Sequence, residues 1–103
     1  MSEYIEDIKK YSSDVNEAAV DSIVKYCGIA LKSKDASLVS ASDPKELKTV
    51  ADGFAKKKLE LSEDEANAGI EKVCDAMQGV RQKHRVTFYY LLAEHTGTMG
   101  KLA

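Results

Sequence analysis

The chain has 103 residues, of which 31% are charged and 44% hydrophobic, and its formal net charge at pH 7 is −2. This length fits one domain that buries about 60 to 70% of its unfolded surface, and the composition excludes disordered and fibrous classes. The acidic N-terminus has no apolar signal core, and no run approaches the roughly 20 apolar residues that cross a bilayer. We therefore predict one soluble, cytoplasmic domain over residues 1–103, with no membrane partner.

Apolar residues at helical spacing predict two helices near the N-terminus. The first covers about residues 2–11, and the second begins at Asp14 or Asn16 and continues to about Leu31. Gly28 lies inside the second helix, where a glycine costs about 1 kcal/mol relative to alanine. Either a neighbouring backbone packs closely at Gly28 or the helix is locally weak there, and we favour close packing.

Residues 33–43 interrupt the helical pattern with a polar loop, which Leu38 and Val39 anchor on the core. Asp43 then provides the N-cap of a third helix, with a proline at the first helical position and Glu46 in the capping-box position. This third helix ends in a run of three lysines.

A second capping box begins the fourth helix, with Ser62 as the N-cap and Glu65 three residues later. The pattern predicts that this helix continues to about Gln78. Gly79 follows and leads almost directly into the last helix.

The last helix is predicted from Arg81 to Thr96, with Gly97 as a left-handed C-cap. Between Val86 and Ala93 only one residue is polar, so this helix is apolar on nearly every side and must be surrounded by other elements. We therefore predict an all-α fold, in which five helices form an irregular, partly orthogonal bundle around this central C-terminal helix.

The segment 35–46 has the length and terminal acidic residues of a calcium-binding loop between two helices. Val39 and Ser40 stand where that loop has an oxygen ligand and a glycine, and Glu46 is explained as a helix-start residue. We therefore predict no metal site and no cofactor.

Arg81, Lys83 and Arg85 concentrate positive charge in the first turns of the last helix, where they oppose the helix dipole. With free backbone N–H groups beside them, these residues could bind a phosphate or carboxylate group. The alternative, which we favour, is that Glu71 and Asp75 on the preceding helix neutralise them.

The lysines at the end of the third helix, Lys56, Lys57 and Lys58, form a second basic cluster. A fourth helix of about 16 residues would separate the two clusters by ~24 Å if the helices pack side by side. We therefore predict no broad nucleic-acid surface.

His84 and His95 lie about three helical turns apart in the predicted last helix, which is too far for one metal ion. We expect both to be packed, hydrogen-bonded side chains. Cys27 and Cys74 fit free thiols, and no local motif supports a catalytic pair of either cysteine with a histidine.

Three stretches resemble a family of small bacterial proteins of about 100 residues, known only as a domain of unknown function. They are the loop up to Asp43, the segment FAKKKLEL at 54–61, and RVTFYYLL at 85–92 with His95 and Gly97. The resemblance implies an all-helical, single-domain bacterial protein and supplies no activity or catalytic residue. His84 stands where the family has an aromatic residue, which favours a packing role for it.

The sequence does not identify a function. The leading hypothesis is a non-catalytic interaction module that binds a protein partner or forms a homodimer, because capped amphipathic helices are abundant and catalytic motifs are absent. The alternative is a small anionic-ligand binder that uses Arg81, Lys83 and Arg85. An enzyme that pairs a histidine with a cysteine is a third hypothesis.

Overall fold

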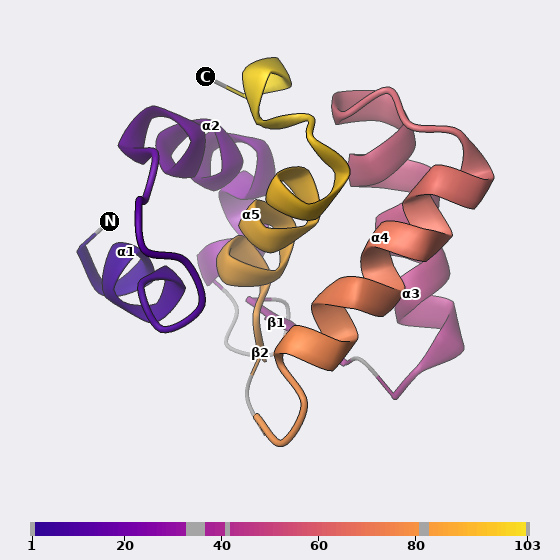
Figure 1. The fold of residues 1–103 in the computed structure, drawn as a ribbon, viewed down its shortest axis with the longest axis horizontal. Helices are drawn as coiled ribbons and strands as arrows, with labels where there is room; N and C mark the ends of the chain where they lie inside the picture. The colour runs from indigo at the N-terminus through magenta and orange to yellow at the C-terminus, as the bar shows by residue number, and fades with distance from the viewer. Residues whose placement is uncertain (1, 33–36, 41, 81–82, 103) are drawn as a thin grey trace.

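The computed structural model describes residues 2–32, 37–40, 42–80 and 83–102. Within these residues the chain forms an irregular helical bundle around a central C-terminal helix, as predicted. In Figure 1, α5 lies in the middle, with α1 and α2 on one side of it and α3 and α4 on the other. The α-helices are α1 (Ser2–Ile8), α2 (Glu17–Cys27), α3 (Pro44–Val50), α4 (Glu63–Ala76) and α5 (Arg85–Thr96).

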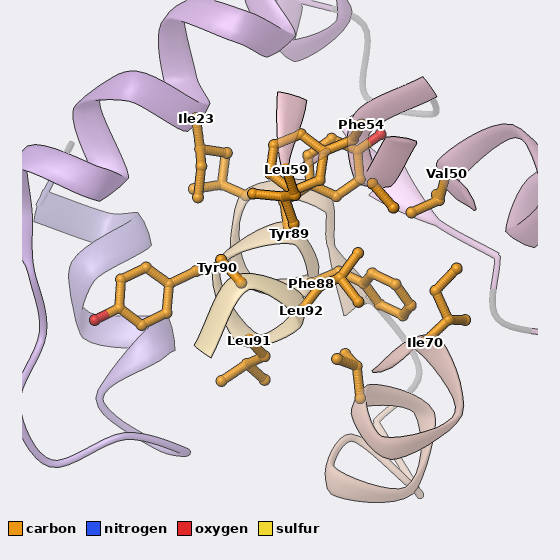
Figure 2. Close-up of a cluster of buried hydrophobic side chains, with 14 of the residues drawn as sticks. Ile23, Val50, Phe54, Leu59, Ile70, Phe88, Tyr89, Tyr90, Leu91 and Leu92 are labelled. Carbon is orange, nitrogen blue, oxygen red and sulfur yellow. The ribbon is translucent and has the colours of Figure 1, made fainter. Parts of the chain in front are cut away.

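The central helix is covered on every side, because all eight residues from Val86 to Ala93 are buried. Helices α1, α2 and α4 all contact it. Figure 2 shows how Ile23 of α2 and Ile70 of α4 approach it from different directions. The prediction of a central helix wrapped by shorter amphipathic helices is therefore confirmed.

The start of α5 differs from the prediction, because the helix begins at Arg85 rather than at Arg81. Strand β2 (Lys83–His84) precedes it and pairs antiparallel with β1 (Leu38–Val39). The backbone of His84 is extended and lies directly opposite Leu38 in the ladder. Lys83 and His84 therefore belong to the strand and cannot be part of the helix. The short ladder also attaches the loop after α2 to the core, where Val39 is buried.

Helix α2 ends earlier than predicted, and Gly28 is the reason. Its φ angle of +50° lies in the left-handed region, which favours glycine, and a 3-10 turn, η1 (Gly28–Lys32), follows. A Cβ atom at this position would meet no atom within 4 Å. The interpretation of Gly28 as a point of close backbone packing is therefore wrong. Helix α1 likewise stops at Ile8, before the predicted end at Tyr11.

The predicted third helix is continuous but changes character partway. After α3 the chain forms a π-helix, η2 (Ala51–Lys58), in which the N–H of Leu59 donates to the carbonyl of Phe54. The ring of Phe54 stacks on that of Tyr89 in α5, with centroids 4.1 Å apart and planes 14° apart. A final 3-10 turn, η3 (Met99–Lys101), follows α5.

The predicted helix caps are largely confirmed. The Ser62 hydroxyl accepts the Glu65 N–H and the Glu65 carboxylate accepts the Ser62 N–H, so the capping box of α4 is complete. Gly97 adopts the left-handed conformation at the end of α5. At α3 the Asp43 carboxylate accepts the N–H of Lys45, but Glu46 turns towards α5 and pairs with a different residue.

Candidate functional site

Arg85 belongs to the predicted basic site, and its guanidinium group contacts oxygen atoms of three other residues. Nη2 lies 2.5 Å from Oε1 of Glu46 and 3.2 Å from the carbonyl oxygen of Leu38, while Nη1 donates to the Tyr89 hydroxyl at 2.9 Å. The side chains of Arg85 and Glu46 are only 12% and 22% exposed. For Arg85, the neutralising carboxylate is therefore Glu46 and not Glu71 or Asp75.

The structure describes one of the other two residues of the predicted site. Arg81 lies outside the described residues. Lys83 lies on β2, where its Nζ donates to the carbonyl oxygen of Val80 at 2.6 Å. Lys83 and Arg85 therefore make separate contacts with other residues of the described chain.

The N-terminal turn of α5 also contacts oxygens of the chain. The N–H of Arg85 donates to the carbonyl of Ser37 at 2.7 Å. In the same turn, the Thr87 hydroxyl donates to Oδ2 of Asp7 at 2.5 Å. A helix N-terminus favours anions, and here a carboxylate of α1 already lies beside it.

The two histidines lie in different environments. His84 is half-buried on β2 and its ring meets Tyr4 edge to face, with centroids 6.4 Å apart. His95 is exposed in the last turn of α5. The packing role expected for both residues therefore holds for His84 alone.

Both thiols are shielded rather than activated. Burial raises the pKa of Cys27 from 9.0 to about 11, with Arg85 acting weakly in the opposite direction. Burial also raises the pKa of Cys74, against an opposing influence of Lys83. Because the thiolate is the nucleophile, a raised pKa disfavours the reactive form of both cysteines.

A hollow of the described surface lies between two helical segments that the sequence pattern does not bring together. This α3–α4 groove has a volume of about 490 Å³ and runs between α4 and the continuous α3–η2 segment. Its lining includes apolar side chains from both walls, which are Leu47 and Ala51 on one wall and Ile70 and Cys74 on the other.

The rim of the α3–α4 groove is charged, and its two sides differ. On the α3–η2 side, Lys48 pairs with Asp52 at 3.3 Å, and Asp52 also pairs with Lys56 at 3.4 Å. These contacts, the hydrogen bond from Lys48 first, lower the pKa of Asp52. On the α4 side, Glu63 and Glu71 are exposed, and neither forms an ion pair with the described part of the chain.

The apolar residues of this groove can be recognised in the sequence, although helical periodicity alone does not show that they line a groove. Leu47 and Ala51 are one turn apart in the third helix, and Ile70 and Cys74 are one turn apart in the fourth. Apolar residues at helical spacing predict buried faces for all four, yet Leu47 and Cys74 are only half-buried. The two helices contact each other along one edge of these apolar faces. The other edge of each face is exposed in the groove.

Two further features bear on the class of protein. No helix in the described ranges is long and apolar enough to cross a membrane. Likewise, the described residues include no group of three or more histidine, cysteine, aspartate or glutamate side chains placed to hold a metal ion.

The fold and the groove define a small, mostly helical protein with a recessed apolar surface. The chain belongs to the family described as "Protein of unknown function (DUF2853)", which matches residues 3–100. The comparison with curated proteins gives no match. The resemblance inferred from the sequence to a domain of unknown function is thereby confirmed.

Proposed function

We propose that this protein is a non-catalytic interaction module and that its α3–α4 groove binds a helical segment of a protein partner. The observation that carries this proposal is the apolar lining of the groove. Among the described residues, Tyr26, at 43% exposed, is the one large hydrophobic side chain that is exposed to solvent. A partner would therefore find apolar contacts in the groove rather than on a flat patch.

The dimensions of the groove suit side-chain insertion. A volume of about 490 Å³ lies within the roughly 300 to 1,000 Å³ range of binding pockets. Two helices form its walls, which is the arrangement used when an amphipathic helix binds in a groove. The π-helix η2 contributes Ala51 and Asp52 to the same site, and π-helical segments are frequent at functional sites.

The alternative proposal is a small anionic-ligand binder that uses Arg81, Lys83 and Arg85. It has less support, because Glu46 pairs with Arg85 and Asp7 lies at the N-terminal turn of α5. An external anion would have to displace these carboxylates. The thiol pKa values support a non-catalytic role over a cysteine-dependent enzyme.

We also propose that the protein acts in the bacterial cytoplasm. The support is the resemblance to small bacterial proteins and the presence of two free cysteines, which are typical of reducing compartments. Fractionation of cells that produce a tagged protein tests this proposal, and recovery from the periplasm or medium would contradict it.

The interaction proposal is tested by peptide display. Random short peptides are selected on the wild-type protein, and their affinities are then compared on two variants of α4. Asn67→Trp places a large ring at the rim of the groove, whereas Ala68→Trp places the same ring on the next, exposed position outside the lining.

We expect the selected peptides to bind the Ala68→Trp variant normally and the Asn67→Trp variant about tenfold more weakly or less. Melting temperatures of both variants check that the fold is retained. Peptides that bind both variants equally well, or a selection that yields no binder, would contradict the proposed function.

A further inference from the structure

We propose that the occupant of the α3–α4 groove is a basic amphipathic helix. It presents aliphatic residues to the apolar side chains on the two walls of the groove and Lys or Arg residues to the α4 rim. This inference rests on the proposed function and adds the chemistry and orientation of the partner. It follows from the charges on the two rims and from the spacing of the lining residues.

The α4 rim is an acidic row. Glu63, Asn67 and Glu71 follow one another at four-residue intervals, so they lie on adjacent turns of the same helix face, and all three are exposed. At a rise of 1.5 Å per residue, the two glutamates are about 12 Å apart along the helix. Since neither carboxylate forms an ion pair with the described residues, both are available to a basic partner.

On the opposite rim, which α3 and η2 form, the carboxylate is already paired with lysines of the chain. Asp52 is already shared between Lys48 and Lys56. Behind this rim, the exposed Lys45 and Lys57 line a second, shallower hollow of about 370 Å³. A basic side chain is therefore repelled on the α3 side and attracted on the α4 side, which fixes how the occupant helix is rotated in the groove.

The apolar side chains on the two walls of the groove determine where the occupant helix needs aliphatic residues. Leu47 and Ala51 are four residues apart on one wall, and Ile70 and Cys74 are four residues apart on the other. Aliphatic side chains on successive turns of an occupant helix match this spacing. The length from Glu63 to Cys74 is about 16 Å, or three helical turns.

The spacing of the two glutamates then predicts the spacing of the basic residues. An occupant helix that lies along α4 needs two Lys or Arg residues about seven or eight positions apart to reach both carboxylates. The aliphatic residues fall between them on the neighbouring face. This is the pattern of a basic amphipathic helix.

The probe is a blocked, alanine-rich helical peptide of about 15 residues with leucines on one face and two lysines, about seven residues apart, on the flank of that face. The matched control peptide has the same composition, with both lysines moved to the face opposite the leucines. Binding of each fluorescent peptide to the wild-type protein, to Glu63→Gln/Glu71→Gln and to Asn67→Trp is measured by anisotropy.

We expect the wild-type protein to bind the flank-lysine peptide about fivefold to tenfold more tightly than the control, because each exposed ion pair contributes modestly. This preference should shrink at high salt and disappear in Glu63→Gln/Glu71→Gln. Both glutamates are exposed and the Ser62 cap remains, so this variant should fold.

The alternative outcomes are distinct. If Asn67→Trp weakens both peptides but the double glutamine variant keeps the preference, the groove binds helices and the inference about charge is wrong. If neither peptide binds the wild-type protein, the inference is also wrong, whatever the display selection yields. A doubled solution mass, with both peptides excluded, would show that a second copy of the chain occupies the groove instead.

Discussion

The guanidinium group of Arg85, the first residue of α5, pairs with the carboxylate of Glu46 on α3 at 2.5 Å. The two residues are 39 positions apart in the chain, and their contact joins the central helix to one wall of the α3–α4 groove. The same guanidinium group also donates to Leu38 on β1 and to Tyr89. Arg85 therefore connects three elements, α3, α5 and β1, through one guanidinium group.

Glu46→Gln should destabilise the protein, because it removes the negative charge that pairs with the largely buried Arg85. Hydrogen bonds to charged groups contribute about 1.5 to 3 kcal/mol, so we expect a loss of about 2 kcal/mol. For a domain of this length that corresponds to a fall of about 8 to 10 °C in melting temperature. Thermal unfolding followed by circular dichroism measures this change.

The control for this prediction is Glu63→Gln, which removes an exposed carboxylate that has no ion-pair partner in the described structure. Its melting temperature should change by much less. Equal effects of the two substitutions would show that the Arg85–Glu46 pair has no special role in stability.

Tyr90→Phe should cost about 1 kcal/mol of stability. The Tyr90 ring is buried, and its hydroxyl accepts the N–H of Asn16, the N-cap of α2, at 2.8 Å. Removing the oxygen leaves that N–H without its acceptor. Urea unfolding measures the loss, with Tyr26→Phe as the control because Tyr26 is exposed; a Tyr90→Phe variant as stable as Tyr26→Phe would contradict the assignment.

Gly69→Ala should destabilise the protein, although alanine is the better helix former by about 1 kcal/mol. A Cβ atom at Gly69 would lie 2.5 Å from Cγ2 of Thr96 and 2.8 Å from Cδ1 of Leu92, so α4 and α5 would have to separate or repack. Overpacking of this kind costs about 1 to 3 kcal/mol.

A second substitution tests this explanation directly. Thr96→Ser removes the Cγ2 methyl group but keeps the hydroxyl that donates to the Leu92 carbonyl. In a double-mutant cycle measured by urea unfolding, Gly69→Ala should be less harmful in the Thr96→Ser background than in the wild type. Strictly additive effects would show that the contact between α4 and α5 is looser than the structure indicates.

The stability of the protein should fall between pH 9 and about 11, in part because of Cys27. Burial raises the pKa of this thiol in the folded state from 9.0 to about 11. In that window the unfolded chain loses the thiol proton while the folded chain retains it, so rising pH favours unfolding. Cys27→Ala should show a shallower fall in the free energy of unfolding, and parallel curves for the two proteins would contradict the assignment.

The sequence predicts the helices well where the signals are local. The Ser62 and Glu65 side chains complete a capping box within four residues, and Gly97 needs only its own conformational freedom to end α5. The run from Val86 to Ala93, in which only Thr87 is polar, also identifies the central helix, because a helix that is apolar on nearly every side has to be buried. These features depend on neighbours in the chain.

The features that the sequence does not predict depend on residues far apart in the chain. The β1–β2 ladder replaces the expected first turn of α5, because His84 pairs with Leu38 across 46 positions. Gly28 and Gly69 look alike as helical glycines, yet one supplies a left-handed backbone angle and the other a close helix contact. Periodicity alone cannot separate these two uses of glycine.

The candidate site was harder to predict than the fold. The sequence marks Arg85 as unusual but does not identify its partner, Glu46 on α3, which it explains equally well as part of a helix cap. The groove arises from how α3 and α4 diverge, and a helical-face pattern identifies buried sides without showing which edge of each side stays open.

The central claim is that the α3–α4 groove is the surface that binds a partner segment. The most direct test is a methyl-labelled nuclear magnetic resonance titration with a display-selected peptide. We predict the largest shifts at the methyl groups of Leu47, Ala51 and Ile70, and small shifts at Ile8 of α1 and Ile23 of α2. Shifts concentrated on the α1–α2 side, with those of the groove unchanged, would contradict the account.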